Sequence, residues 1–179
     1  SLELTREYRA TQKQNKGFRV FIPALSGLGD LIALASVVRD VDDFNDFCFL
    51  VHEHNALAME YFFPSAKLIL FKPFHRSPDG KRELFKALSE VKARLSFDIT
   101  GSYLSKMLCW SADIEYRFCL DLRSSGLADF VDEHVSWVGL NIYDAYAMIR
   151  PLLKLTKSFD ISVGSWQEIK TVALSTGGR

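Results

Sequence analysis

Short apolar runs and longer amphipathic runs alternate along this chain. The first apolar run, residues 18–22, is rich in β-branched and aromatic side chains and predicts a buried strand. After it, apolar side chains recur at helical spacing and predict a helix. They are Leu31, Leu34, Ala35 and Val38.

The same rhythm continues through the next hundred residues. Further strands are predicted at residues 47–51, 67–71, 97–100 and 114–120. Helices are predicted at residues 56–62, 81–95 and 103–110, with a turn at 77–80 before the second of them. A long apolar-periodic stretch, residues 138–155, predicts a last helix that Pro151 breaks or kinks near its end. This alternation predicts an α/β, Rossmann-like fold with a mostly parallel sheet and helices on both faces.

The turn at residues 25–30, Leu-Ser-Gly-Leu-Gly-Asp, carries the first candidate chemistry. Strand-to-helix turns rich in glycine are where α/β proteins bind ligands. Asp30 is predicted to lie in the first helical turn, where free backbone N–H groups and the helix dipole favour an ionised carboxylate. An exposed carboxylate on a rigid turn can act as a base.

Two other interpretations of this turn remain open. Gly27 and Gly29 can serve a tight turn and close packing, and an aspartate there stabilises the helix without any functional role. A dinucleotide-binding oxidoreductase is the second alternative, with Glu53 near the end of the next strand. Ile32 disfavours it, because the fingerprint needs a small residue at that position.

Composition limits the classes of protein and partner. The chain has 179 residues, 48% apolar and 25% charged, which suits one soluble domain. Its 22 basic and 22 acidic side chains cancel, so nucleic acid is not an expected partner. No run is long enough to span a bilayer and no signal peptide is evident, which predicts a cytoplasmic location. Cys48, Cys109 and Cys119 lack ligand spacing and are predicted to pack as small hydrophobes.

The two ends of the chain suggest a larger organisation. Residues 170–175 predict one more strand, and the turn at 176–179 begins a βα unit that is not completed. We therefore expect a fragment. Its parts are a polar extension at 1–16, a Rossmann-like domain at 17–169 and the start of a missing second domain at 170–179.

Cationic and imidazole side chains gather after the third predicted strand. They are Lys72, His75, Arg76, Lys81 and Arg82. Ligands meet an open α/β sheet at such strand ends, although a solvated surface is the alternative explanation for a basic run. His52 and His54 suggest a metal site, but without a third ligand nearby a polar strand end explains them as well, and we assign no metal.

The turn at residues 26–30 resembles the opening of glycosyltransferase family 9, the heptosyltransferases of lipopolysaccharide core synthesis, which often read Gly-Leu-Gly-Asp there. Residues 97–102 resemble a strand and turn of that family, and 132–134 a segment before its closing helix. Residues 175–178 sit where its second domain begins. The sequence departs from the family at Gly101, which follows Thr100 where the family has Asp-Leu-Gln, and in the turn of the second domain.

The resemblance implies a GT-B architecture in which this half binds the acceptor and the missing half binds a nucleotide-sugar donor. It implies that Asp30 is the general base of an inverting sugar transfer that requires no cofactor or metal. Acceptor-binding residues would be Ser26, Gly27, Gly29, Arg76, Lys81 and Arg82. The implied acceptor is an acidic glycolipid. The resemblance therefore also implies peripheral contact of the protein with the inner face of the inner membrane. A non-catalytic Rossmann-like module that binds sugars or a protein is the alternative.

Overall fold

The computed structural model describes residues 18–41, 43–114, 116–121, 133–136, 141–151 and 153. These residues form a six-stranded, fully parallel sheet in the order β3-β2-β1-β4-β5-β6. The strands are β1 (Val20–Ala24), β2 (Phe47–His52), β3 (Lys67–Phe71), β4 (Leu95–Asp98), β5 (Tyr116–Asp121) and β6 (Glu133–Ser136). This is the doubly wound order, and it confirms the predicted Rossmann-like α/β fold.

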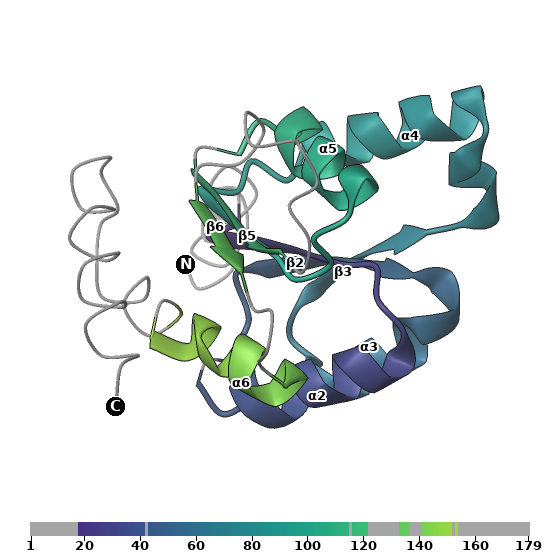
Figure 1. Ribbon diagram of the computed structural model, residues 1–179. Helices are drawn as coiled ribbons and strands as arrows, with labels where there is room; N and C mark the ends of the chain where they lie inside the picture. The colour runs from purple at the N-terminus through teal and green to yellow at the C-terminus, as the bar shows by residue number, and fades with distance from the viewer. Residues whose placement is uncertain are drawn as a thin grey trace, which may run out of the picture.

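Helices cover both faces of the sheet, as Figure 1 shows. One face carries α2 (Leu28–Val38), α3 (Ala56–Phe62) and α6 (Ile142–Ala147). The other carries α4 (Pro78–Ser89) and α5 (Tyr103–Ser111). Two short 3-10 helices, η1 (Glu53–Asn55) and η2 (Pro73–Arg76), follow β2 and β3.

The strands separate two apolar cores by the alternation of their side chains. In β1, Val20 and Ile22 pack into the core beneath α2, while Phe21 packs into the core beneath α4 and α5. In β2, Phe49 and Leu50 divide in the same way. Successive side chains of a strand point to opposite faces, so a strand that is covered on both sides must be apolar throughout. The three cysteines are free and buried, as predicted.

The helix predicted at residues 81–95 differs from α4 at both ends. Ser77 caps α4 by accepting a hydrogen bond from the Gly80 N–H at 3.1 Å, and Pro78 occupies the first helical position. Serine followed by proline is therefore a helix start here, rather than the separate turn that we predicted. The helix ends at Ser89, and Lys92 has a φ of 46°, which no α-helix accommodates.

The end of the described chain holds a strand that the sequence pattern did not predict. Residues 133 and 134, expected to lead into the last helix, lie in β6. Helix α6 starts at Ile142, after the side chain of Asn141 accepts from the Asp144 N–H at 2.9 Å. It ends at Ala147, four residues before Pro151, whose nitrogen has no hydrogen to donate. The predicted extension at 1–16 and the strand at 170–175 lie outside the described residues.

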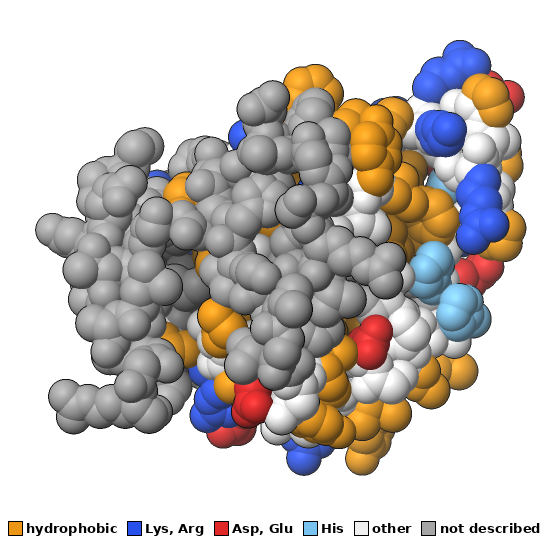
Figure 2. Space-filling view, in the orientation of Figure 1, with side chains coloured by type: hydrophobic (Ala, Val, Ile, Leu, Met, Phe, Trp, Pro, Cys, Tyr) orange, Lys and Arg blue, Asp and Glu red, His pale blue; other side chains and the backbone are white. Residues whose placement is uncertain are grey.

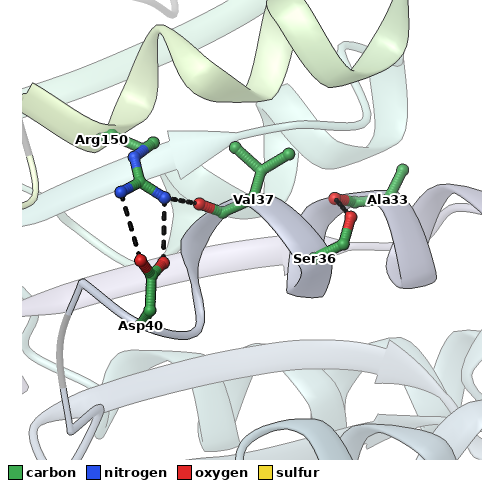
Figure 3. Close-up of polar contacts among 5 residues, drawn as sticks. All are labelled: Ala33, Ser36, Val37, Asp40 and Arg150. Atoms are coloured by element: carbon green, nitrogen blue, oxygen red, sulfur yellow. Dashed lines mark hydrogen bonds and ion pairs between the residues drawn. The ribbon is translucent and has the colours of Figure 1, made fainter.

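An ion pair links Arg150, which follows α6, to the C-terminal end of α2 (Figure 3). Arg150 donates to the two carboxylate oxygens of Asp40 at 2.9 and 3.3 Å, and also to the backbone carbonyl of Val37. A cation at a helix C-terminus satisfies carbonyls that have no partner in the helix and interacts favourably with the helix dipole. Arg150 therefore ties the described residues that directly follow α6, 148–151, to the C-terminal end of α2.

The order of the strands creates a switch point between β1 and β4. Helix α2 leaves β1 toward one face and α5 leaves β4 toward the other, so the two turns diverge at the carboxyl edge of the sheet. In open α/β sheets, ligands bind in the crevice at such a point. Within the described part of the chain, no helix has the length and apolar character needed to cross a membrane.

Candidate functional site

The turn between β1 and α2 presents Asp30 at the carboxyl edge of the sheet. Gly27 is the N-cap residue of α2, and its carbonyl accepts from the Asp30 N–H at 3.1 Å. No side chain caps the first turn of this helix. Asp30 is half-buried and lies in that first turn, as predicted. Its carboxylate therefore lies near backbone N–H groups that lack partners within the helix.

The two glycines of this turn border open space. A Cβ built on Gly27 or Gly29 would meet no atom within 4 Å, and neither residue has a positive φ. Close packing and a left-handed backbone are thus not the reasons for these glycines. Glycine in a helix weakens it relative to alanine, so the turn is less stable than it could be and keeps free space beside Asp30.

Tyr146 of α6 faces this turn from the outer layer. It is 3% exposed, and burial raises the pKa of its phenol, with the negative charge of Asp30 as the second cause. The phenol is therefore close enough to Asp30 to feel its charge. A further hydrogen bond fixes the backbone of Ser26, whose carbonyl accepts from the side-chain amide of Asn55 at 3.3 Å.

The neighbouring turn, between β4 and α5, is closed by hydrogen bonds. One oxygen of Asp98 accepts from the N–H groups of Thr100 and Gly101 at 3.0 and 2.9 Å. The other accepts from the Ser105 hydroxyl at 2.8 Å. Burial raises the pKa of Asp98 to about 6, although these hydrogen bonds act to lower it.

Thr100 connects the two turns. Its hydroxyl accepts from the Leu25 N–H at 3.1 Å and donates to the Pro23 carbonyl at 3.0 Å. A single side chain thus fixes the end of β1 relative to the turn after β4. Ser102 then caps α5 by accepting from the Ser105 N–H at 3.1 Å. Asp30 is consequently presented from a rigid base.

A cavity of about 510 Å³ opens beside these turns, on the side of the sheet covered by α4 and α5. Its polar lining comes from the carboxyl ends of β2 and β4 and from η2 and α4. These residues are His52, His75, Arg76, Lys81, Thr100 and Ser102. In Figure 2, histidine and cationic side chains gather below α4 next to apolar ones.

The rest of the cavity lining is apolar. It consists of Leu25, Phe71, Leu84, Phe85, Leu104 and Leu108. Leu84 and Leu108 are at most 2% exposed, whereas Phe85 and Leu104 are 40% and 42% exposed. The interior of the cavity is therefore apolar, and apolar side chains also lie at its opening.

The predicted acceptor-binding residues lie in three places: the turn after β1, the cavity lining and, for Arg82, the exposed side of α4. Ser26, Gly27, Gly29 and Asp30 form the turn and do not line the cavity, but Leu25, directly before them, does. Arg76 and Lys81 line the cavity.

Arg82 lies elsewhere in the structure. Its guanidinium donates to Asp79 at 2.7 Å on the exposed side of α4, and it is not among the residues that line the cavity. Consecutive helical residues point about 100° apart, which explains why Lys81 reaches the cavity and Arg82 does not.

The two histidines near the cavity pack as a stacked pair. The rings of His52 and His54 lie 5.2 Å apart at 12°. Burial lowers the pKa of His52, and the neighbouring His54 and Arg76 lower it further. Among the described residues, no three His, Cys, Asp or Glu side chains are grouped as metal ligands would be. His52 is thus a neutral polar group near pH 7.

Sequence reasoning missed Asp98, Thr100 and Ser102. The sequence Asp-Ile-Thr-Gly-Ser at 98–102 resembles a family pattern, but that resemblance implies no role for its side chains. An aspartate that ends a buried strand and is followed by threonine, glycine and serine is a local signal for a side-chain-closed turn. That signal was available in the sequence.

Comparison with solved structures shows a likeness in fold to glycosyltransferases. A glycosyl transferase family 9 protein from Veillonella parvula superposes with a TM-score of 0.61 at 16% identity, over 76% of this chain and 41% of that protein. The Escherichia coli heptosyltransferase WaaC, solved with ADP-2-deoxy-2-fluoro heptose, gives a TM-score of 0.60 at 15% identity, over 81% and 51%. The chain thus spans about half the length of these proteins. The sequence matches no family profile, and no curated protein matches it significantly.

Proposed function

We propose that this chain is the acceptor-binding half of a heptosyltransferase-like inverting glycosyltransferase. It would transfer a sugar from a nucleotide-sugar to a lipopolysaccharide-type glycan acceptor. The observation that carries the proposal is Asp30 on an uncapped, open glycine turn at the switch point of the sheet. The likeness in fold to the two glycosyltransferases supports the same interpretation.

The proposed reaction uses Asp30 as the general base. Its carboxylate takes the proton of an acceptor hydroxyl while that oxygen bonds to the anomeric carbon of the donor. The bond to the nucleoside diphosphate breaks on the opposite side of that carbon and its electrons leave with the phosphate, which inverts the configuration. The open space at Gly27 and Gly29 would admit the reacting groups close to the backbone. Positioning then supplies much of the rate.

The environment of Asp30 suits a base that must stay in place. Thr100 fixes the end of β1, and the buried phenol of Tyr146 is near enough to Asp30 for its pKa to be raised by that charge, after burial itself. Neither glycine adds a side chain that would obstruct the carboxylate. We propose that the donor is bound mainly by a domain beyond residue 179, and that the reaction takes place on the cytoplasmic side, with peripheral contact at the membrane surface.

The test is release of nucleoside diphosphate by the whole natural protein. ADP-heptose and a lipid A-Kdo type acceptor are supplied, and the wild type is compared with Asp30→Asn. We expect release that depends on the acceptor and falls roughly 10²- to 10⁴-fold in the variant, the usual contribution of a general base. Glu53→Gln, at an exposed carboxylate that does not line the cavity, is the matched control.

One observation favours a second candidate, a non-catalytic module that binds a protein. Leu28 and Ile32 lie one helical turn apart on α2, beside Asp30, and are 47% and 45% exposed. Apolar side chains in that position suit a surface covered by another protein or domain. Absence of turnover with several nucleotide-sugars would favour this candidate over sugar transfer, whereas an Asp30→Asn protein as active as the wild type would remove Asp30 as the general base.

A further inference from the structure

The cavity beside the turn combines an apolar interior with cations at its edge. Leu84 and Leu108 form buried walls, and Phe85 and Leu104 continue the apolar surface out to the opening. Arg76, at the end of η2, lies close enough to His52 to lower the pKa of its imidazole. This lining is therefore complementary to a ligand that has both an apolar body and a negative charge.

Two cations of the cavity lining, Arg76 and Lys81, are unpaired within the described residues, whereas His75 of the lining lies 3.7 Å from the Glu83 carboxylate. No carboxylate in the described part of the chain forms an ion pair with Arg76 or Lys81, and both side chains are exposed. The neighbouring Arg82, in contrast, is paired with Asp79. His52, with its lowered pKa, adds no full charge at neutral pH. Positive charge is thus left at the cavity edge for an anion to neutralise.

The hydroxyl groups of the cavity are already used. Thr100 both accepts and donates in its bonds to Leu25 and Pro23, and the Ser102 hydroxyl is bonded to Ser105. The Nδ1 atom of His75 accepts from the Lys72 N–H at 3.0 Å. A sugar ring needs several partners for its hydroxyls, and leaving them unpaired in a buried site is costly. The cavity therefore favours an apolar body over a sugar.

We infer that this cavity binds an amphiphilic anion: an acyl-like chain that carries a phosphate or a carboxylate. The chain would lie against Leu84, Phe85 and Leu108, and the anion would lie between Arg76 and Lys81. The identification of this anion as the lipid-like part of the acceptor rests on the proposed function. Binding of the anion itself does not depend on it.

The inference is tested by calorimetric titration of the whole natural protein with octyl phosphate below its micelle concentration. Inorganic phosphate and octanol are the two half-ligands. We expect one octyl phosphate per chain, bound at least about a hundredfold more tightly than either, since each methylene removed from water contributes roughly a fourfold gain. Octanoate is titrated in parallel, and the tighter of the two anions identifies a lipid phosphate or a fatty carboxylate as the source.

Matched variants separate the two parts of the site. The double variant Arg76→Gln, Lys81→Gln should weaken octyl phosphate binding by roughly tenfold or more, while Arg82→Gln should leave it unchanged. Phe85→Ser should weaken it by roughly fivefold, while Leu57→Ser, at an apolar side chain that is 82% exposed on α3, should not. Thermal unfolding of each variant verifies that it is folded.

Three results would overturn the inference. Inorganic phosphate that binds as tightly as octyl phosphate indicates a simple anion site, and octanol that does so indicates an uncharged apolar cavity. A double variant that binds like Arg82→Gln removes the anion from Arg76 and Lys81. The titration requires neither donor nor turnover, so it can fail while sugar transfer by Asp30 succeeds, and the reverse.

Discussion

The two turns that meet at the switch point satisfy their polar groups in different ways. After β4, Asp98 and Ser102 bond the backbone and side chains of their own turn. After β1, the N-cap residue is Gly27, which has no side chain to bond anything. The first arrangement makes a rigid support, and the second leaves donors and space for a ligand. We therefore propose that stability and function are assigned to different turns of one sheet edge.

The strongest test of this contrast removes the carboxylate that closes the second turn. Asp98→Ala leaves two backbone N–H groups without their acceptor and removes one of the two acceptors of the buried Ser105 hydroxyl, the other being the Ser102 carbonyl. We expect the free energy of unfolding to fall by about 4 kcal/mol, measured by urea denaturation. Asp30→Ala, in the open turn, should cost at most about 1 kcal/mol. Equal losses in the two variants would contradict the division between the turns.

The ionisation of Asp98 should make stability depend on pH. Its pKa is about 6 in the folded chain against an ordinary 3.8, so the folded state binds the proton more tightly than the unfolded state. This contribution is therefore complete below about pH 4 and is lost as pH rises through 6, a decrease of about 3 kcal/mol in the free energy of unfolding. The measurement is denaturation of the wild type between pH 4 and 8.

Asp98→Asn provides the control for that pH profile. Its amide oxygen can accept from Thr100 and Gly101, and its amide nitrogen can donate to the Ser105 hydroxyl, but it does not titrate. Subtracting the variant's profile from that of the wild type removes the contributions of all other carboxylates. A difference that stays constant from pH 4 to 8 would show that Asp98 does not titrate in this range.

Removing the cap of α5 should have a moderate effect. Ser102→Ala loses the hydroxyl that accepts from the Ser105 N–H, and we expect about 1 kcal/mol of destabilisation in a thermal or urea melt. Because Ser102 also lines the cavity, octyl phosphate affinity is measured in the same variant. An unchanged affinity is expected, since this hydroxyl already bonds Ser105 and is not needed by an apolar ligand.

Filling the open turn should slightly stabilise the fold while impairing function. Gly29→Ala should raise the free energy of unfolding by about 0.5–1 kcal/mol, because its Cβ meets no atom and the unfolded chain loses freedom. Gly27→Ser should gain a few tenths of a kcal/mol by adding a capping hydroxyl. Nucleoside-diphosphate release should fall in both if the space serves the reacting groups. Full activity in both stabilised variants would show that the space is not used.

Gly80→Ala is the matched glycine substitution in a closed environment. A Cβ at this position would lie 2.0 Å from the backbone oxygen of Phe74, so the helix or the preceding turn must move. We expect a loss of about 3 kcal/mol in urea denaturation, opposite in sign to the effect at Gly29. A neutral result would show that α4 and η2 separate easily.

Sequence reasoning succeeded where the information was local. The helix at 56–62 and the strand at 67–71 were predicted with their observed bounds, because proline and polar residues terminate clear apolar patterns there. It failed at β6, which is four residues long and whose pairing partner, β5, lies elsewhere in the chain. A short strand is defined by its neighbour more than by its own pattern.

Within the candidate site, the chemical type of a residue was easier to predict from the sequence than the place that its side chain reaches in the structure. Asp30 lies in the first turn of α2 because a glycine turn before an apolar helix fixes that placement locally. Lys81 and Arg82 have the same charge and adjacent positions, yet one lines the cavity and the other pairs with Asp79. The direction of a side chain on a helix depends on where the helix begins and packs, and the prediction placed the start of α4 three residues too late.

The sequence alone determined the α/β class, the open turn and Asp30 at the start of its helix, since periodicity and turn chemistry act between near neighbours. The tertiary structure decided which strand ends meet. His52 ends β2, Arg76 follows β3 and Thr100 follows β4. They line one cavity because the order β3-β2-β1-β4 brings those ends together. The burial that raises the pKa of Asp98 is likewise a property of the assembled sheet. Contacts between distant segments depend on strand order, which local patterns do not encode.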